Sequence, residues 1–348
     1  MELSPDGRAY QAFLAGAKSY LMDTVYPRAR EEVARASEAA AGDKHATAER
    51  LRGNPFYEYF AFLEHYVQHH KYTSRHGLAV EAERQRGQLT SRLMAVAEKH
   101  YTHADVEVPA YYSAVDVHQH PGNLHGDVLA GDIYKASAAT TQPGSTDAYG
   151  LHHKFAAAIA KYSPEPKKVL DLACGFGKSA LPIAQRWPSA KVEGVDLSEG
   201  CLRLAAVEAA DAGAENLHYR LADVASTGEP DEAYDLVTST MLLHELDNGA
   251  VRAAMKEAFR VLAPGGHLVQ LDFRARDEVE RFFLHGHGQR NNEPYMADFD
   301  MFDFRAYLEA LGFRDVVIEP FEESPGATAP NFPKWRLPWT VIAARKPN

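Results

Sequence analysis

The sequence predicts an α/β protein in which an open, mostly parallel sheet follows a helical region. Three observations support this fold class. From about residue 165 onward, short apolar runs alternate with amphipathic segments, which is typical of strand–helix units. A glycine-containing turn, Gly175-Phe176-Gly177, follows the first of these runs. The first hundred residues, in contrast, show mainly the helical spacing of apolar side chains.

Composition excludes several classes of function. The 348 residues include 37 Lys and Arg against 48 Asp and Glu, so the formal net charge is −11. An acidic chain argues against binding to a nucleic-acid backbone, which needs a concentrated basic surface. We find no run of about 18 apolar residues and no signal peptide, so we expect a cytoplasmic protein without membrane contact. Two cysteines, Cys174 and Cys201, are too few for a disulfide framework.

Residues 1–104 are predicted to form a helical N-terminal domain. Pro27 interrupts the first apolar stripe and starts a second helix. Asn54 followed by Pro55 is typical of a helix start, and Leu78–Tyr101 is predicted as one further helical stretch. The many aromatic side chains exceed what isolated helices need. We therefore expect this domain to act as a lid and to support a homodimer.

Residues 105–160 are predicted to connect the helical domain to the sheet through short helices and loops, because glycines and prolines interrupt any long period. The domain that follows spans residues 161–348. Its predicted strands are Lys168–Leu172, Lys191–Asp196, Leu217–Leu221, Tyr234–Ser239, His267–Phe273, Asp315–Glu319 and Thr340–Ala344. Its predicted helices are Ser179–Trp187, Glu199–Ala212, Val251–Leu262 and Phe304–Leu311.

The first strand and its glycine turn form a candidate cofactor site. Gly175 and Gly177 lack a Cβ, so the backbone there can approach a ligand closely. Asp196 ends the second strand, where a carboxylate can accept hydrogen bonds from both hydroxyls of a ribose. The turn also matches the dinucleotide fingerprint, but the charge of Asp171 would repel a pyrophosphate. The same charge suits a cofactor that carries an ammonium and a sulfonium.

At these residues the sequence resembles the class I S-adenosylmethionine-dependent methyltransferases. The resemblance covers about residues 165–273 and is carried by five segments in the expected order. These segments are Asp171–Gly177, Gly194–Leu197, Leu221–Val224, Tyr234–Glu245 and Ala258–Val269. One departure is Ala173, where many members of the family have glycine.

The resemblance implies a Rossmann-like sheet of seven strands, the last of them antiparallel, and S-adenosylmethionine as the cofactor. It implies that adenosine lies between Asp196 and Asp223 and that the methionine amino group lies near Asp171. The cofactor-binding residues expected from it are Asp171, Ala173, Gly175, Gly177, Asp196, Leu197, Asp223, Val224 and Thr240. Two alternatives remain open: a nicotinamide-dependent oxidoreductase that uses the same glycine turn, and a non-catalytic protein that binds S-adenosylmethionine.

Histidines near the expected site are candidates for catalysis. Methyl transfer needs a base only when the acceptor arrives protonated, and histidine titrates near neutrality. His244 follows the fourth strand at the expected mouth of the site. His118 and His120 would point to the same side of an extended segment. With His125 they would also suit a divalent metal, but we do not predict one, because their spacing matches no zinc signature.

The substrate is expected to be a small organic molecule that is methylated at a hydroxyl, amine or thiol. We expect the connection after the fifth strand to lie over the acceptor pocket and to select the substrate. The predicted substrate-binding residues are His125, His152, Glu245, His285, Asn292 and Tyr295. The sequence does not identify the acceptor.

Overall fold

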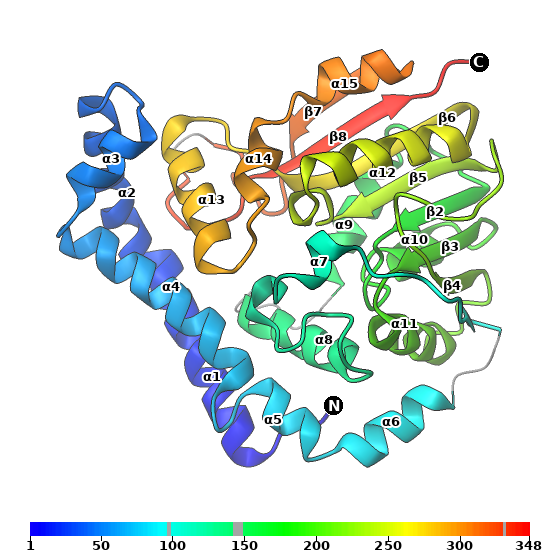
Figure 1. Ribbon diagram of the computed structural model, residues 1–348, viewed down its shortest axis with the longest axis horizontal. Helices are drawn as coiled ribbons and strands as arrows, with labels where there is room; N and C mark the ends of the chain where they lie inside the picture. The colour runs from blue at the N-terminus through cyan, green and yellow to red at the C-terminus, as the bar shows by residue number, and fades with distance from the viewer. Residues whose placement is uncertain (96–98, 142–148, 330–331) are drawn as a thin grey trace.

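The computed structural model describes residues 1–95, 99–141, 149–329 and 332–348. Within them the strands form one sheet in the order β1-β4-β3-β2-β5-β6-β8-β7, in which β8 runs antiparallel to both of its neighbours (Figure 1). The strands are β1 (Tyr101–Thr102), β2 (Lys168–Leu172), β3 (Lys191–Asp196), β4 (Leu217–Leu221), β5 (Tyr234–Thr240), β6 (Leu262–Phe273), β7 (Arg314–Pro320) and β8 (Trp339–Arg345).

The sheet confirms the α/β fold class and the antiparallel last strand. All seven predicted strands are present, and the bounds of β2, β3 and β4 match the prediction to the residue. β2 is buried on both faces apart from Lys168, whereas β4 alternates buried apolar and half-buried polar side chains. The sheet has one strand more than predicted. The extra strand is β1, which pairs with the edge strand β4.

Helices cover both faces of the sheet. One face packs against α9 (Gly150–Ile159), α10 (Ala180–Arg186) and α11 (Glu199–Asp211). The other packs against α12 (Asn248–Val261) and α15 (Phe304–Leu311). Helix α15 ends where Gly312 adopts the left-handed conformation at φ 108°. The parallel strands thus present their carboxyl ends along one edge of a buried sheet, where ligands of such folds bind.

The N-terminal region is helical, as predicted, and lies beside the carboxyl ends of the strands (Figure 1). Its helices are α1 (Pro5–Tyr20), α2 (Tyr26–Ala39), α3 (Lys44–Leu51), α4 (Pro55–Thr73), α5 (Leu78–Glu83) and α6 (Arg86–Met94). Pro27 lies in the first turn of α2, and the side chain of Asn54 caps α4 by accepting hydrogen bonds from the N–H groups of Phe56 and Tyr57. Both helix starts were predicted.

The single helical stretch predicted over Leu78–Tyr101 is wrong. The helical conformation is interrupted near Gln85, between α5 and α6, and residues 96–98 lie outside the described part. Tyr101 belongs to a strand because the sheet edge offers it backbone partners: the N–H of Tyr219 donates to the carbonyl of His100 at 2.9 Å. The helical spacing of leucines ends at Leu93, so the sequence pattern gave no information on the strand that contains Tyr101.

The connecting segment contains short helices and loops, as expected, although residues 142–148 lie outside the described part. Its helices are α7 (Ala110–Ser113) and α8 (Ala130–Thr141). After β6 the chain forms α13 (Glu278–Arg290) and α14 (Met296–Met301). Phe282 and Phe283 of α13 share a buried core with α1, α2 and α4. This packing fixes the N-terminal helices over the mouth of the sheet. The domain boundaries at residues 104 and 160 stay predictions.

Candidate active site

The turn between β2 and α10 has the backbone geometry of a ligand-binding loop. Ala173, Gly175 and Gly177 all have positive φ, at 54°, 56° and 79°. The N–H of Gly175 donates to Oδ2 of Asp196 at 2.8 Å, and Oδ1 of Asp196 accepts from the N–H of Ser198 at 2.8 Å. These bonds join the ends of β2 and β3. Glycine adopts such φ values freely, so Ala173 is the strained residue of this turn, and strain of this kind concentrates at functional sites.

A small cavity of about 60 Å³ adjoins this turn. Five of the nine predicted cofactor residues line it: Ala173, Gly175, Asp196, Leu197 and Val224. The remaining lining comes from Tyr111, Tyr112, Leu124, Tyr134, Lys178, Cys201, Met241, Leu242, Glu245 and Leu246. A half-buried carboxylate beside apolar side chains has the chemistry that a ribose joined to an adenine ring requires, but about 60 Å³ holds such a ligand only if the lining moves apart.

The other four predicted cofactor residues do not line the small cavity. Asp171 is fully buried, and one carboxylate oxygen accepts from the hydroxyl of Ser179 at 2.5 Å. Its other oxygen, Oδ1, has no hydrogen-bond partner among the described residues. Burial raises the pKa of Asp171 to about 7. An unpartnered carboxylate oxygen just before the turn is an acceptor that fits the amino group of S-adenosylmethionine.

Local contacts explain what three of these residues do instead of lining the small cavity; they are Gly177, Asp223 and Thr240. A Cβ at residue 177 would lie 2.3 Å from the hydroxyl oxygen of Tyr219, so glycine is needed there for packing. Oδ1 of Asp223 accepts from the N–H of Ala225 at 2.8 Å. Thr240 is almost completely buried in β5.

A larger cavity of about 470 Å³ lies between the N-terminal helices and the carboxyl ends of the strands. Tyr134 and Met241 line both cavities and form the wall between them. Phe273, Trp335, Leu337, Trp339, Met22, Val67 and Leu151 contribute apolar surface. The volume is within the roughly 300–1,000 Å³ typical of small-molecule sites.

His244 lines the larger cavity and has a fixed orientation. Its Nδ1 lies 2.6 Å from Oδ1 of Asp272, and Oδ2 of Asp272 accepts from the N–H of Leu243 at 2.8 Å. Its Nε2 lies 3.9 Å from Glu245 and 4.0 Å from Glu293, beyond hydrogen-bonding distance. Burial lowers the pKa of His244, but the carboxylate of Asp272 outweighs it, so the pKa is raised. This arrangement can hold or move a proton at Nε2.

His118 also lines the larger cavity, but both of its ring nitrogens are engaged. Nε2 lies 2.9 Å from Glu245 and Nδ1 lies 2.8 Å from Glu293. Burial disfavours the charged ring, yet the two carboxylates raise the pKa of His118 to about 9. His118 is therefore an imidazolium at neutral pH and holds two carboxylates together, which does not suit the predicted role in proton transfer.

His120 and His125 do not converge with His118. Residues Val117–Gln119 form a 3-10 turn in which His118 has φ 57°, so the extended geometry assumed for this cluster is wrong. The His120 ring is buried 5.2 Å from that of Tyr72, and burial lowers its pKa to about 4. The His125 ring lies 5.4 Å from that of Tyr112. Across the described residues, no group of three or more potential ligands is arranged to hold a metal ion.

Comparison with known proteins agrees with this geometry. Residues 169–266 match a family described as a methyltransferase domain. This part of the chain is a class I S-adenosylmethionine-dependent methyltransferase domain. The match begins in β2 and ends in β6, so it contains the glycine turn, Asp196 and His244.

Individual curated relatives match about a third of the chain. A demethylmenaquinone methyltransferase of Thermus thermophilus is 39% identical over 108 residues, which are 31% of this chain and 48% of the relative. A trans-aconitate 2-methyltransferase of Methylobacterium radiotolerans is 39% identical over 103 residues, or 30% of this chain and 36% of the relative. The chain thus spans about half or less of the length of these curated relatives. Among solved structures, the YcgJ protein of Bacillus subtilis is 18% identical with a TM-score of 0.43, over 57% of this chain and 99% of that one.

Of the predicted substrate-binding residues, only Glu245 lies at a cavity of the methyltransferase domain, where it faces the cofactor side. His285 lies outside both cavities and is bonded to Asp300 at 3.0 Å. Asn292 is exposed and donates to the carbonyl of Asp116, and the Tyr295 hydroxyl donates to that of Tyr111. These contacts fix loops around the site. His152 is buried on α9, and its ring nitrogens have no partners among the described residues.

Sequence reasoning missed the residues that the N-terminal helices contribute to the larger cavity. Lys18 of α1 and Glu64 and Lys71 of α4 line it. Glu64 and Lys71 are 1% and 3% exposed and share a helix face with the buried Phe60 and Val67. Charged residues in the register of an apolar stripe are a signal that was available in the sequence, because such residues are rarely buried without a partner.

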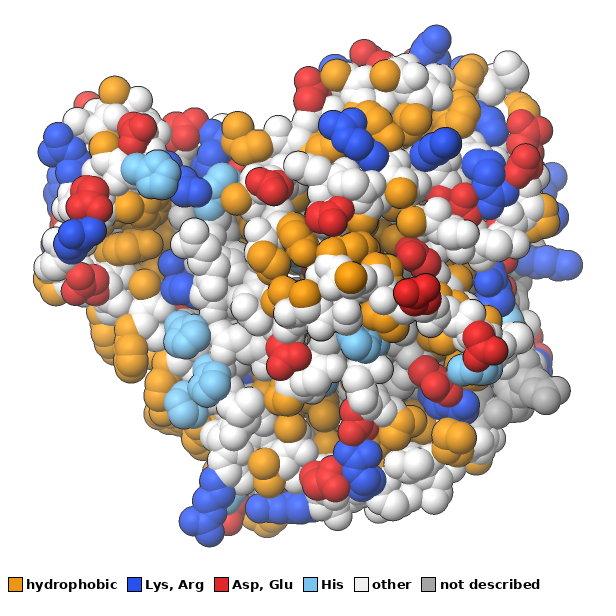
Figure 2. All heavy atoms as spheres, in the orientation of Figure 1, with side chains coloured by type: hydrophobic (Ala, Val, Ile, Leu, Met, Phe, Trp, Pro, Cys, Tyr) orange, Lys and Arg blue, Asp and Glu red, His pale blue; other side chains and the backbone are white. Residues whose placement is uncertain are grey.

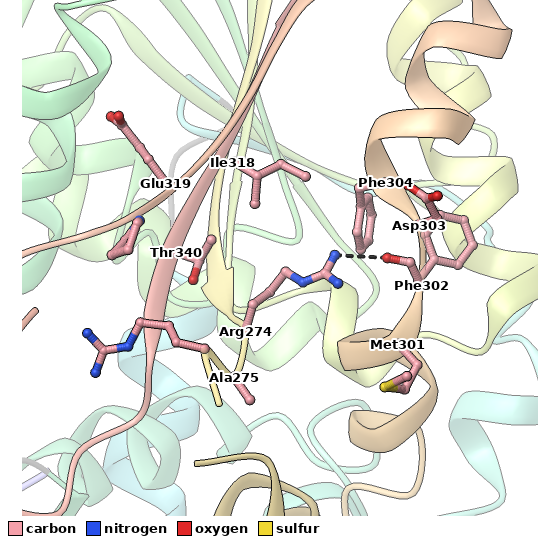
Figure 3. A pocket seen from close by; sticks show the side chains of 11 residues that line it. Arg274, Ala275, Met301, Phe302, Asp303, Phe304, Ile318, Glu319 and Thr340 are labelled. Carbon is pink, nitrogen blue, oxygen red and sulfur yellow. Dashed lines mark hydrogen bonds between the residues drawn. The ribbon is translucent and has the colours of Figure 1, made fainter. Parts of the chain in front are cut away.

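A third hollow lies at the outer edge of the sheet, between β6, β7 and α14 (Figure 3). The guanidinium of Arg274 points across it and donates to the carbonyls of Phe302 and Asp300 at 2.8 and 2.7 Å. Arg276 is bonded to Glu280 and to the carbonyl of Thr328. Because these cationic groups hold the protein's own oxygens, the hollow has a structural explanation and lies apart from the methyltransferase site.

Proposed function

We propose that the protein transfers a methyl group from S-adenosylmethionine to a hydroxyl, amine or thiol of a small molecule in the 470 Å³ cavity. The observation that carries this proposal is the His244–Asp272 pair, because it lies at the cavity that shares Tyr134 and Met241 with the cofactor cavity. Bound S-adenosylmethionine supplies an already activated methyl group on a sulfonium. The protein then has to orient the acceptor and exclude water.

In this proposal His244 accepts the proton that the acceptor loses. Asp272 bonds to Nδ1 and so selects the tautomer in which Nε2 can act as the base. Asp272 is itself fixed by the N–H groups of Leu243 and Phe273, at 2.8 and 2.9 Å. A base held in this way needs no rearrangement when the acceptor binds. His118 acts differently, because its positive charge keeps Glu245 and Glu293 ionised at the site.

Several observations support a small acceptor. The cavity is lined by residues from α1, α4, α9 and the loops around β5 and β8, which enclose it on several sides. On the face shown in Figure 2, acidic and basic side chains are interspersed, which is unlike the continuous basic surface that a nucleic acid needs. The two relatives compared above are named for menaquinone-type and aconitate substrates, which are small molecules.

Other expectations stay predictions. No helix within the described residues is long and apolar enough to cross a membrane. The cytoplasmic location, the homodimer and the division into a helical domain, a connecting segment and a cofactor domain remain to be measured. The exposed aromatic side chains Phe13, Tyr20, Phe56, Tyr59 and Phe62 on α1 and α4 support the homodimer.

Calorimetry with S-adenosylhomocysteine tests the cofactor assignment. We expect binding by the wild type, weaker binding by Asp196→Asn, and unchanged binding by the control Asp105→Asn, whose side chain is fully exposed. Binding of reduced nicotinamide cofactor in place of S-adenosylhomocysteine would establish the oxidoreductase alternative.

Product formation tests the reaction itself. A pool of small metabolites is incubated with methyl-labelled S-adenosylmethionine, and labelled products are identified by mass spectrometry. We expect His244→Gln to form little product while it still binds S-adenosylhomocysteine, and His45→Gln, at an exposed position on α3, to behave as the wild type. Cofactor binding without any labelled product from the wild type would favour the non-catalytic alternative.

A further inference from the structure

The small cavity beside the glycine turn is closed on one side by the connecting segment. Tyr111 and Tyr112 of α7 line this cavity together with Gly175 and Asp196. Its volume of about 60 Å³ is far below the roughly 300–1,000 Å³ that small-molecule sites provide. A ligand as large as S-adenosylmethionine therefore enters only when part of this lining moves away.

The part of the lining with the least regular structure is α7 and the residues after it. Gly175 and Asp196 are held by the paired strands β2 and β3, and the loop after β5 is held by Asp272, which accepts from the N–H of Leu243. Helix α7, in contrast, has four residues and is followed only by a 3-10 turn. We call residues 110–121 the flap.

Both ends of the flap have the structure of hinges. Residues 103–109 before it have no regular secondary structure. After it, Gly122 has φ 74°, and a Cβ at Gly126 would lie 2.1 Å from the carbonyl oxygen of Gly122, so this turn requires glycine. Asn123 in the turn donates to the carbonyl of Tyr112 at 2.8 Å. Because this bond joins α7 to the turn, α7 follows when the turn rotates.

The loop 290–295, between α13 and α14, holds the flap closed. Four polar contacts join the flap to this loop, and we call them the seam. They are Gln119 to the carbonyl of Arg290 at 2.6 Å, Asn292 to the carbonyl of Asp116 at 2.9 Å, His118 to Glu293 at 2.8 Å and Tyr295 to the carbonyl of Tyr111 at 3.2 Å. Since polar contacts exchange for contacts with water at small net cost, a seam of this kind opens more readily than a packed apolar core.

The backbone of the flap is strained where the seam holds it. His118 and Gln119 both have φ 57°, a conformation that side chains other than glycine rarely adopt. Such residues persist only where surrounding contacts fix them. The same two residues make two of the four seam contacts. Opening the seam therefore also releases this strain, which favours an open flap.

His118 connects the flap to both cavities. Its Nε2 lies 2.9 Å from Glu245, which lines the small cavity, and its Nδ1 lies 2.8 Å from Glu293, which lines the larger one. Its ring is stacked on Tyr134, the wall between the cavities, with ring centres 6.1 Å apart. Contacts between charged groups are stronger than neutral hydrogen bonds, so His118 is the strongest point of the seam.

We propose that the flap must open for S-adenosylmethionine to enter and for S-adenosylhomocysteine to leave, and that the seam, with His118 as its latch, keeps the flap closed during methyl transfer. This inference rests on the proposed function, because it takes the small cavity as the cofactor site. A closed flap excludes water from the sulfonium. Because the seam contains no cofactor atom, weakening it speeds entry and exit alike and leaves the affinity nearly unchanged.

The test is the association and dissociation rate of S-adenosylhomocysteine, measured by surface plasmon resonance on the full chain. Asn292→Gly and Tyr295→Phe each remove one seam contact, and neither residue is among the described residues that line the two cavities. Glycine suits the φ of 62° at residue 292, and phenylalanine keeps the ring that lies beside Tyr111. We expect each variant to raise both rates about three-fold or more, the double variant to raise them further, and the dissociation constant to change by less than about two-fold.

His118→Gln removes the charge of the latch and should raise both rates about ten-fold or more. Tyr59→Phe, at an exposed position on α4, is the matched control for Tyr295→Phe, and His45→Gln on α3 is the matched control for His118→Gln. Both controls should keep the wild-type rates. Circular dichroism identifies any variant that does not fold.

Hydrogen exchange of the wild type tests the flap without any substitution. The amides of residues 110–121 should exchange faster than those of β2, and saturation with S-adenosylhomocysteine should slow them about ten-fold. The amides of α3, which lies away from both cavities, should not respond.

Three results would overturn the flap: wild-type rates in both the double variant and His118→Gln, a rise in the dissociation rate alone, or exchange at residues 110–121 that S-adenosylhomocysteine leaves unchanged. The proposed function fails differently. Absence of S-adenosylhomocysteine binding would remove the cofactor site and the flap with it. Binding without any labelled product would remove methyl transfer, whereas faster exchange of S-adenosylhomocysteine in the seam variants would still establish the flap.

Discussion

Replacement of His118 by glutamine is expected to remove a pH-dependent part of the folding stability. The imidazole lies between Glu245 and Glu293, at 2.9 and 2.8 Å. Burial works against its charge, but the two carboxylates prevail and raise its pKa from 6.5 to about 9. Because the pKa is higher in the folded than in the unfolded chain, the stabilisation is complete below pH 6.5. It is lost as the pH rises through 9.

The size of this contribution follows from the two pKa values. The pKa of His118 rises by about 2.5 units, and each unit corresponds to about 1.4 kcal/mol, so the full contribution is about 3 kcal/mol. The His118 side chain is 18% exposed, so solvent screens the pair only weakly. Glutamine keeps a hydrogen-bond donor at this position but cannot become charged.

Urea unfolding of the wild type and of His118→Gln, at steps from pH 7 to pH 10, measures this contribution as a difference. The free energy of unfolding should be higher for the wild type than for His118→Gln, and this difference should be largest at pH 7. It should shrink by about 2–3 kcal/mol between pH 7 and pH 10. Groups that titrate equally in the wild type and in His118→Gln do not contribute to the difference between their free energies of unfolding. His45→Gln, on the exposed side of α3, should give a difference that does not change with pH. A constant difference for His118→Gln would show that this histidine is not charged in the folded protein.

Three further predictions use the same kinds of measurement. Asp272→Asn should lower the rate of methyl transfer about 100-fold or more. In the wild type the rate should rise with pH through a midpoint above 6.5, because Asp272 raises the pKa of His244. In Asp272→Asn this midpoint should move to lower pH. A rate equal to that of the wild type would exclude His244 as the base. Gly177→Ala should lower the free energy of unfolding by about 2–4 kcal/mol, since its Cβ would lie 2.3 Å from the hydroxyl of Tyr219 and its φ is 79°. Urea unfolding measures this loss, and a midpoint at the same urea concentration as the wild type would contradict it. Glu64→Gln should cost about 3–5 kcal/mol because it leaves a buried guanidinium without its carboxylate, whereas the exposed control Glu49→Gln should cost less than about 1 kcal/mol.

The sheet was predictable because its central strands are largely buried and its outer strands still show short strand-like patterns. Lys168–Leu172 is mostly apolar and almost completely buried, and Leu217–Leu221 alternates buried apolar with half-buried polar side chains. Both patterns are typical of a strand. Gly312 marks the end of α15 because it is the residue that most easily adopts φ 108°. The two-residue strand β1 was not predictable, since it is too short to show a period and exists only because the edge of β4 accepts it.

The candidate site was predictable at the cofactor turn and not at the acceptor cavity. The spacing of Gly175 and Asp196 defines a local geometry that sequence expresses directly. The partners of His244 and His118, in contrast, come from β6 and from the loop after α13, and their pairing depends on tertiary structure. Local reasoning also assumed an extended chain at His118, where the backbone turns instead.

The walls around the larger cavity come from stretches that lie far apart along the chain, from Lys18 and Lys71 to Trp335 and Trp339. The glycine turn and Asp196, in contrast, lie within 22 consecutive residues. In the proposed function, the donor site would therefore be centred on one short stretch of sequence, whereas the acceptor site would draw on most of the chain and share Tyr134 and Met241 with the donor cavity. In the proposed function, exchange of the N-terminal helices between related chains would therefore change only one wall of the acceptor cavity, because His244, Trp335 and Trp339 stay with the rest of the chain.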